Sequence, residues 1–131
     1  MTINSKILCD ADFVIALFLD TDSNHQKAFD IYNSIDSSLF VILNITIYEV
    51  ATVLSRLLPQ AEAIYTLESI RTTFNNPVIF DYKWENDVYK LYNSFEKKNI
   101  SFFDCACLHY AKMVKAKVAS FDKFYNPEIL A

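Results

Sequence analysis

Four acidic residues in this 131-residue chain stand where short apolar segments meet helical ones. They are Asp10, Glu49, Asp104 and Asp122. Two of them directly follow apolar segments, and the other two lie in the first turns of helical patterns. No His or Cys occupies these four positions, and carboxylate oxygens are the ligands that Mg²⁺ and Mn²⁺ prefer. If the fold brings the four side chains together, they are candidates for holding a divalent cation.

The elements that must position these acids can be predicted from the apolar pattern. Short continuous apolar runs indicate strands buried on both faces of a parallel sheet, at residues 7–9, 39–43, 78–80 and 118–119. Apolar residues at helical spacing predict helices over residues 28–35, 47–58, 60–74, 84–95 and 103–114. Strands alternating with helices indicate an α/β fold with a short, mostly parallel central sheet flanked by helices. We find no repeat or linker and expect one domain over residues 1–131.

The predicted topology gives the acids a reason to meet. In an open parallel sheet, ligands bind beyond the carboxyl ends of the strands, where the strand order reverses. Asp10, Glu49 and Asp122 should all reach that edge, and Asp104 can join them from a neighbouring helix start. Four converging carboxylates would repel one another and raise their pKa values unless a cation neutralised them.

Each acid also has a purely structural explanation. Thr46-x-x-Glu49 and Ser101-x-x-Asp104 fit capping boxes, in which an acid binds an otherwise unpaired backbone amide at the start of a helix. Asp10, Asp12 and Asp122 could likewise be ordinary N-caps. Capping does not require the acids to meet, whereas metal binding does.

Composition excludes several classes of protein. The chain has no Gly, so it has neither a P-loop nor a dinucleotide-binding fingerprint. Its net charge of −4 argues against a nucleic-acid binder that relies on its own basic surface, although bound cations could reach phosphates instead. Three cysteines in apolar settings indicate reduced core thiols, and we expect a cytoplasmic protein. No apolar stretch is long enough to span a bilayer, so no membrane is expected.

The ordered set of motifs resembles the PIN domain family, and most closely its small VapC-like toxins. The resemblance covers nearly the whole chain, through the segments beginning at Leu8-Cys9-Asp10, Thr46-x-x-Glu49, Ser101-Phe102-Phe103-Asp104 and Ala119-Ser120-Phe121-Asp122. Asp12 stands where the family commonly has Asn, and Ser120 where it commonly has Thr. We count both as accessory site residues.

This resemblance implies a Mg²⁺- or Mn²⁺-dependent endoribonuclease with its acids in one pocket. It also implies an RNA substrate, a cognate antitoxin protein and a homodimer. We expect Asp10 and Asp104 to be direct ligands of the first metal. Glu49 and Asp122 would complete the site directly or through water, and one of them could orient the attacking water. The number of metal ions and the RNA target stay open.

Several other residues could have functional roles, but structural roles are favoured for them. Cys105, Cys107, His109 and His25 are expected to be structural or surface residues. The aromatic residues Tyr48, Trp84, Tyr92 and Phe95 mostly fall on core stripes, which leaves base stacking as the less favoured interpretation. The lysines at positions 112, 115, 117 and 123 could steer phosphates, but a solvated helix end is favoured.

Two other functions stay open at this level. Asp10-Ala11-Asp12-Phe13-Val14 fits the first motif of a haloacid-dehalogenase-like phosphohydrolase, with Asp10 as nucleophile and Asp12 as acid and base. That interpretation gives Glu49 and Asp104 no role. The second alternative is a catalytically inactive PIN fold that serves as a binding module.

Overall fold

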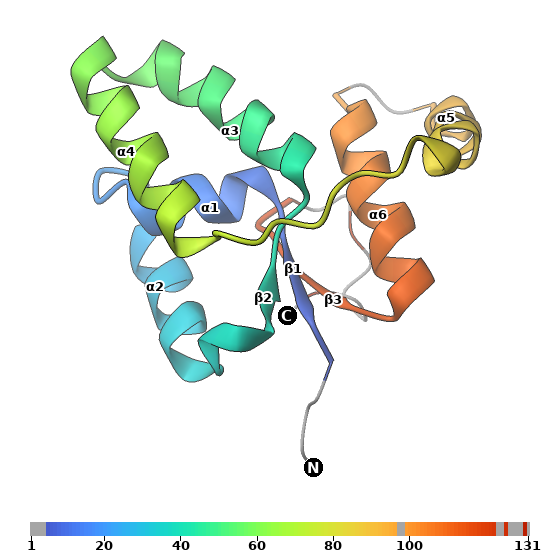
Figure 1. The fold of residues 1–131 in the computed structure, drawn as a ribbon, viewed down its shortest axis with the longest axis horizontal. Helices are drawn as coiled ribbons and strands as arrows, with labels where there is room; N and C mark the ends of the chain where they lie inside the picture. Colours follow the sequence, from blue (N-terminus) through green and yellow to red (C-terminus); the bar gives the residue numbers. More distant parts are fainter. Residues whose placement is uncertain (1–4, 97–98, 123–124, 126–129, 131) are drawn as a thin grey trace.

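A short parallel sheet lies at the centre of the chain, between two groups of helices (Figure 1). The structure is a computed structural model that describes residues 5–96, 99–122, 125 and 130. The strands and α-helices are β1 (Ile7–Cys9), α1 (Ala11–Phe18), α2 (His25–Ser34), β2 (Phe40–Val41), α3 (Asn44–Leu57), α4 (Gln60–Thr73), α5 (Glu85–Ser94), α6 (Phe102–Val114) and β3 (Lys117–Ala119). Two 3₁₀ turns, η1 (Ser37–Leu39) and η2 (Tyr82–Trp84), precede β2 and α5.

The strand order is β2-β1-β3, and both pairings are parallel. Ile7 pairs with Phe40 on one side and with Lys117 on the other. The chain therefore moves from β1 to one side and later returns to its other side. This reversal of direction places a switch point at the carboxyl end of β1, where parallel sheets bind ligands.

The two faces of the sheet are covered by different helices (Figure 1). Ile7 and Cys9 of β1 belong to the core formed with α1, α2, α3 and α4. Leu8 points to the opposite face and packs in the core formed with α5 and α6. This alternation within one strand explains why all three β1 residues are buried and why the strand shows no polar position.

The α/β class is confirmed, and two predicted details differ. Residues 78–80 do not form a strand, because the segment pairs only through the bridge between Leu43 and Val78, and Pro77 before it has no amide to donate. Helix α1 is absent from the predicted helices, since it is apolar almost throughout and shows no amphipathic stripe. Within the residues described, none of the helices is both long and apolar enough to span a membrane.

Candidate active site

An acidic pocket of about 240 Å³ opens at the carboxyl end of the sheet. We use this name for the pocket lined by Asp10, Ala11, Asp12, Glu49, Asn99, Ser101, Asp104 and Asp122. The structure thus brings together all four acids singled out by their positions in the sequence, together with Asp12. They come from the end of β1, the start of α1, the first turns of α3 and α6, and the segment after β3.

Asp10 is held at the bottom of the site by the start of α1. It is the N-cap of this helix, and its Oδ1 accepts a hydrogen bond of 2.8 Å from the backbone N–H of Ala11. Only 3% of the residue is exposed. Burial, followed by the charge of Asp12, raises the pKa of Asp10 to about 7, although the Ala11 amide opposes this rise.

Ser120 connects two of the acids from the opposite end of the chain. Its Oγ lies 3.2 Å from Asp10 Oδ2 and 3.1 Å from Asp12 Oδ1. A hydroxyl has one proton to donate, so Ser120 can serve one of these carboxylates at a time. The same Oγ accepts a hydrogen bond of 3.0 Å from the backbone N–H of Asp122. Ser120 therefore fixes the loop after β3 against the first two acids.

Asp12 is further held by the backbone of this loop. Its Oδ2 accepts a hydrogen bond of 3.1 Å from the N–H of Phe121. Burial is the main cause that raises the pKa of Asp12, and the bonds from Phe121 and Ser120 oppose it. Asp12 is therefore tied to the site by two separate donors.

Asp104 occupies a capping box, as the sequence predicts. The N–H of Asp104 donates to Ser101 Oγ, and the N–H of Ser101 donates to Asp104 Oδ2, both at 3.0 Å. The acid is 8% exposed and nevertheless lines the pocket. Capping and a place in the pocket are therefore compatible for this residue, because the cap occupies one carboxylate oxygen. Burial, with a contribution from Asp122, raises the pKa of Asp104.

Glu49 has no capping role, which corrects the structural alternative for this acid. Helix α3 begins at Asn44 after the N-cap Leu43, so Thr46 lies inside the helix and is buried. Glu49 Oε1 is buried and has no hydrogen-bond partner among the described residues. Burial and the charges of Asp104 and Asp12 raise the pKa of Glu49 to about 7.

The chemistry of this donor set suits a hard divalent cation. All the titratable side chains that line the acidic pocket are carboxylates. The buried Oε1 of Glu49 has no hydrogen-bond partner in the described part of the chain, and a bound cation could fill that role. In the positions that the described side chains take, no group of three or more His, Cys, Asp or Glu residues is arranged to hold a metal ion. Because caps hold Asp10 and Asp104 in place, the longer side chain of Glu49 is the one best able to turn toward a cation.

Asn99 is a pocket residue that the sequence motifs do not identify. It lines the acidic pocket and has a φ of 69°, in the left-handed region. In a chain without Gly, Asn is one of the few residues that adopts this conformation readily. The sequence signal that could have identified Asn99 is therefore an Asn shortly before a capping box, where the chain turns tightly into a helix.

The remaining candidates lie away from the acids or inside the core. Cys105 and Cys107 are fully buried, and Cys107 Sγ lies 3.6 Å from Thr46 Oγ1. His25 Nδ1 lies 2.7 Å from the carbonyl oxygen of Ala16. His109 packs its ring near that of Trp84.

The described lysines that are candidates for steering phosphates lie at the other end of the sheet from the acids. Lys112 and Lys115 lie at the C-terminal end of α6, whereas Asp104 lies in its first turn. Lys117 pairs with Ile7 at the start of β1 rather than with its carboxyl end. Position 123 lies outside the described residues. The solvated helix end therefore accounts for Lys112 and Lys115.

The aromatic residues that the sequence assigns to core stripes divide into two groups. Trp84 and Phe95 are partly buried and pack against the core beside α6. Tyr48 is 61% exposed and Tyr92 is 43% exposed. The core assignment is therefore wrong for both tyrosines. Tyr48 projects from α3 next to Glu49 in the sequence.

Comparison with known proteins gives one family and several similar folds. The model of the PIN domain family matches residues 7–125. No protein in the curated set matches the chain. The fold is similar to that of VapC20 from Mycobacterium tuberculosis, described as a sarcin-ricin loop cleaving toxin, with a TM-score of 0.79, 19% identity and coverage of 91% of this chain and 92% of that one.

Two further structures share the fold. FitAcB from Neisseria gonorrhoeae has a TM-score of 0.63 and 20% identity, with coverage of 88% of this chain and 87% of that one. FitAB bound to an IR36 DNA fragment has a TM-score of 0.68 and 18% identity, with coverage of 88% and 85%. These three likenesses concern the fold, whereas the family model matches residues 7–125, about nine-tenths of the 131-residue chain. The chain belongs to the PIN domain family.

Proposed function

We propose that this protein is an endoribonuclease that hydrolyses RNA phosphodiester bonds at the acidic pocket with the help of Mg²⁺ or Mn²⁺. The observation that carries the proposal is the meeting of Asp10, Glu49, Asp104 and Asp122 in one pocket, from four separate parts of the chain. Structural capping alone would not bring them together. Membership of the PIN family and the similarity to a toxin that cleaves the sarcin-ricin loop support RNA as the substrate.

Asp10 and Asp104 are proposed as the direct ligands of the cation. Each has one oxygen engaged by a cap, which fixes the direction of the other, and the second oxygen of Asp10 is also oriented by Ser120. Glu49 and Asp122 would complete the site directly or through water. When bound, the cation would lower the pKa of a bound water and stabilise negative charge on the phosphoryl group.

The protein's own groups have separate tasks in this proposal. Ser120 positions Asp10 through its hydroxyl, and Asp12 holds the loop that carries Ser120 by accepting from the N–H of Phe121. Asp10 and Asp104 are buried, and burial strengthens the interaction of a carboxylate with a cation. Because the pKa values of Asp10 and Glu49 are raised to about 7, both groups must lose protons before they bind a cation near neutral pH.

The biological setting is also proposed rather than observed. We infer a toxin of a toxin–antitoxin pair, inhibited by a cognate antitoxin protein and acting as a homodimer in the cytoplasm. The similarity to VapC20, FitAcB and FitAB supports this proposal at the level of the fold. The homodimer follows from the family resemblance, whereas the cytoplasmic location follows from the three cysteines in apolar settings.

The phosphohydrolase alternative explains less of the pocket. It uses Asp10 and Asp12 and assigns no role to Glu49 and Asp104, whose side chains line the same space. The inactive-module alternative would leave five carboxylates in one pocket with no function, although their mutual repulsion opposes folding.

The test is cleavage of total small RNA by the purified protein in Mg²⁺ or Mn²⁺, against EDTA and against Asp10→Asn. Cleavage that needs the metal and is lost in Asp10→Asn supports the nuclease. If the folded protein, supplied with metal, cuts no RNA, the proposal is wrong. Trapping a phosphoaspartate on Asp10 would then favour the phosphohydrolase, because that chemistry forms a covalent intermediate.

A further inference from the structure

An exposed stripe on α3 leads away from the acidic pocket. The α3 stripe, as we call it, consists of Tyr48, Thr52 and Arg56, which follow one another at four-residue spacing and are all exposed. Arg56 also follows Glu49 by seven residues, or two helical turns. It therefore lies on nearly the same face of α3 as Glu49, about 10 Å farther along the helix axis.

Tyr48 presents an open aromatic face at the pocket end of this stripe. The residue is 61% exposed and, within the described part of the chain, its ring contacts no other aromatic ring. Its backbone is well fixed, since Thr52 Oγ1 donates a hydrogen bond of 3.0 Å to the carbonyl oxygen of Tyr48. A large exposed ring on a rigid helix beside a candidate active-site acid is suited to stacking on a nucleobase.

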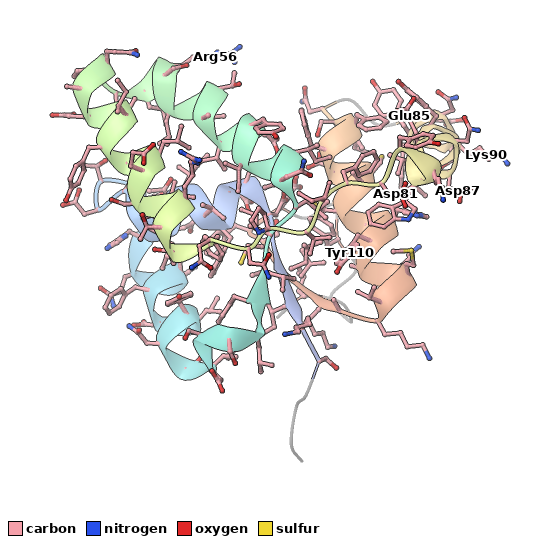
Figure 2. The ribbon with its side chains drawn as sticks, viewed as in Figure 1. Arg56, Asp81, Glu85, Asp87, Lys90 and Tyr110 are labelled. Atoms are coloured by element: carbon pink, nitrogen blue, oxygen red, sulfur yellow. The ribbon has the colours of Figure 1, made fainter. Side chains whose placement is uncertain are left out.

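Arg56 supplies positive charge at the other end of the stripe. Figure 2 shows it at the end of α3 that is farther from α6. Arg56 forms no ion pair with any described residue, whereas the other arginine, Arg71, binds Glu68 at 3.1 Å. The acidic pocket repels phosphates, so RNA that enters it needs compensating charge on the flanking surface. A free guanidinium group can bind a phosphate through two hydrogen bonds.

We propose that the α3 stripe binds the RNA that flanks the cleaved bond, with Tyr48 stacking on a base and Arg56 binding a phosphate. This inference rests on the proposed nuclease function and adds a substrate-binding surface to it. RNA is favoured over a protein partner because the stripe combines one ring with a hydroxyl and a cation. The stripe also shares α3 with Glu49 of the acidic pocket, so it is within reach of an RNA strand that is cut there.

The Tyr48 half of the proposal is tested by RNA binding in the Asp104→Asn background, which prevents cutting. The probe is a short single-stranded RNA of mixed sequence that carries 2-aminopurine, whose fluorescence is quenched by stacking. Tyr48→Leu should raise the Kd about tenfold and remove the quenching. Tyr48→Phe keeps the ring and should bind as the parent does. Because Tyr48 is exposed, both variants should melt at the parental temperature, which is checked by circular dichroism.

The Arg56 half is tested by the salt dependence of the same binding. Arg56→Gln should reduce the slope of log K against log salt concentration by about 0.7, the value for one phosphate contact to a single strand. Arg71→Gln is the matched control, since it removes the other exposed arginine of the chain, and it should leave the slope unchanged.

The outcomes separate this inference from the proposed function. Suppose that the unsubstituted protein cuts RNA with metal, but that adding Tyr48→Leu or Arg56→Gln to the Asp104→Asn protein leaves RNA binding unchanged. The stripe inference alone is then wrong. It is also wrong if Tyr48→Leu leaves RNA binding intact and instead weakens self-association in sedimentation, because the stripe would then be a protein interface. If the parent neither binds nor cuts RNA, both proposals are wrong.

Discussion

Ser120 donates a hydrogen bond of 3.2 Å to Asp10 across 110 positions of the chain. The contact joins the segment after β3, near the end of the described residues, to the N-cap of α1. It is made at the point where β1 and β3 end side by side in the parallel sheet. The pairing of these two strands therefore sets the geometry between a candidate ligand and the hydroxyl that orients it.

Removal of this hydroxyl should impair cleavage without unfolding the protein. Ser120→Ala leaves Asp10 and Asp12 with one donor fewer, and loss of such an orienting contact lowers metal affinity or activity about 10- to 100-fold. Ser120→Thr keeps the hydroxyl and is the matched control. The rates are measured on one RNA substrate at a fixed Mn²⁺ concentration. Equal activity of Ser120→Ala and the parent would show that the hydroxyl has no positioning role.

Asp104 and Ser101 allow stability and chemistry to be separated. Ser101→Ala removes a cap and should lower the free energy of unfolding by about 1 kcal/mol, or the Tm by about 3–5 °C. Asp104→Asn keeps an oxygen that can accept from the Ser101 amide, so the Tm should stay close to the parental value while cleavage is lost. The two variants are compared by thermal melts and RNA cleavage. Loss of fold in Asp104→Asn would favour a purely structural role for this acid.

Much of this site follows from patterns in the sequence. Strand ends in a parallel sheet share an edge, so the positions of Asp10 and Asp122 after apolar segments predict that they lie in one place. The Ser101–Asp104 capping box is also predicted by spacing alone and confirmed. The roles of the acids in metal binding and catalysis stay predictions.

Other features could not be predicted from local patterns. The start of α3 at Asn44 places Thr46 inside the helix, and a Thr-x-x-Glu pattern does not reveal how far upstream the helix begins. The exposure of Tyr48 depends on which side of α3 faces the core, which is set by the packing of α3 against α1 and α4. The positive φ of Asn99 depends on the path of the chain into α6.

Stability of the metal-free protein should fall as the pH rises from about 4 to about 7. Asp10 has a pKa raised from 3.8 to about 7, so the folded protein keeps a proton across this window that the unfolded chain has already released. The stability that the protonated Asp10 contributes is present at low pH and is lost as the pH rises through its pKa in the folded protein. Urea unfolding in EDTA across this range is the measurement. Asp10→Asn should flatten the dependence, and parallel curves for the two proteins would contradict the assignment.

Cation binding should strengthen across the same window. Asp10 and Glu49 both have pKa values of about 7 in the metal-free protein, so protons compete with the metal below neutral pH. The affinity for Mn²⁺ should rise about tenfold per pH unit for each carboxyl group that must lose its proton. Calorimetric titration at pH 5 and pH 7 checks this, and the change in affinity between the two values should be smaller in Glu49→Gln than in the parent. An affinity independent of pH would exclude these acids as ligands.

The most direct test of the metal-dependent nuclease is a Mn²⁺ titration in which bound metal, measured by electron paramagnetic resonance, and RNA cleavage are followed in the same samples. We expect cleavage to increase in step with bound Mn²⁺, and both to be lost in Asp104→Asn while the fold is retained. Cleavage that persists in EDTA, or Mn²⁺ binding that is unchanged in Asp104→Asn, would contradict a metal site built from the acids of this pocket.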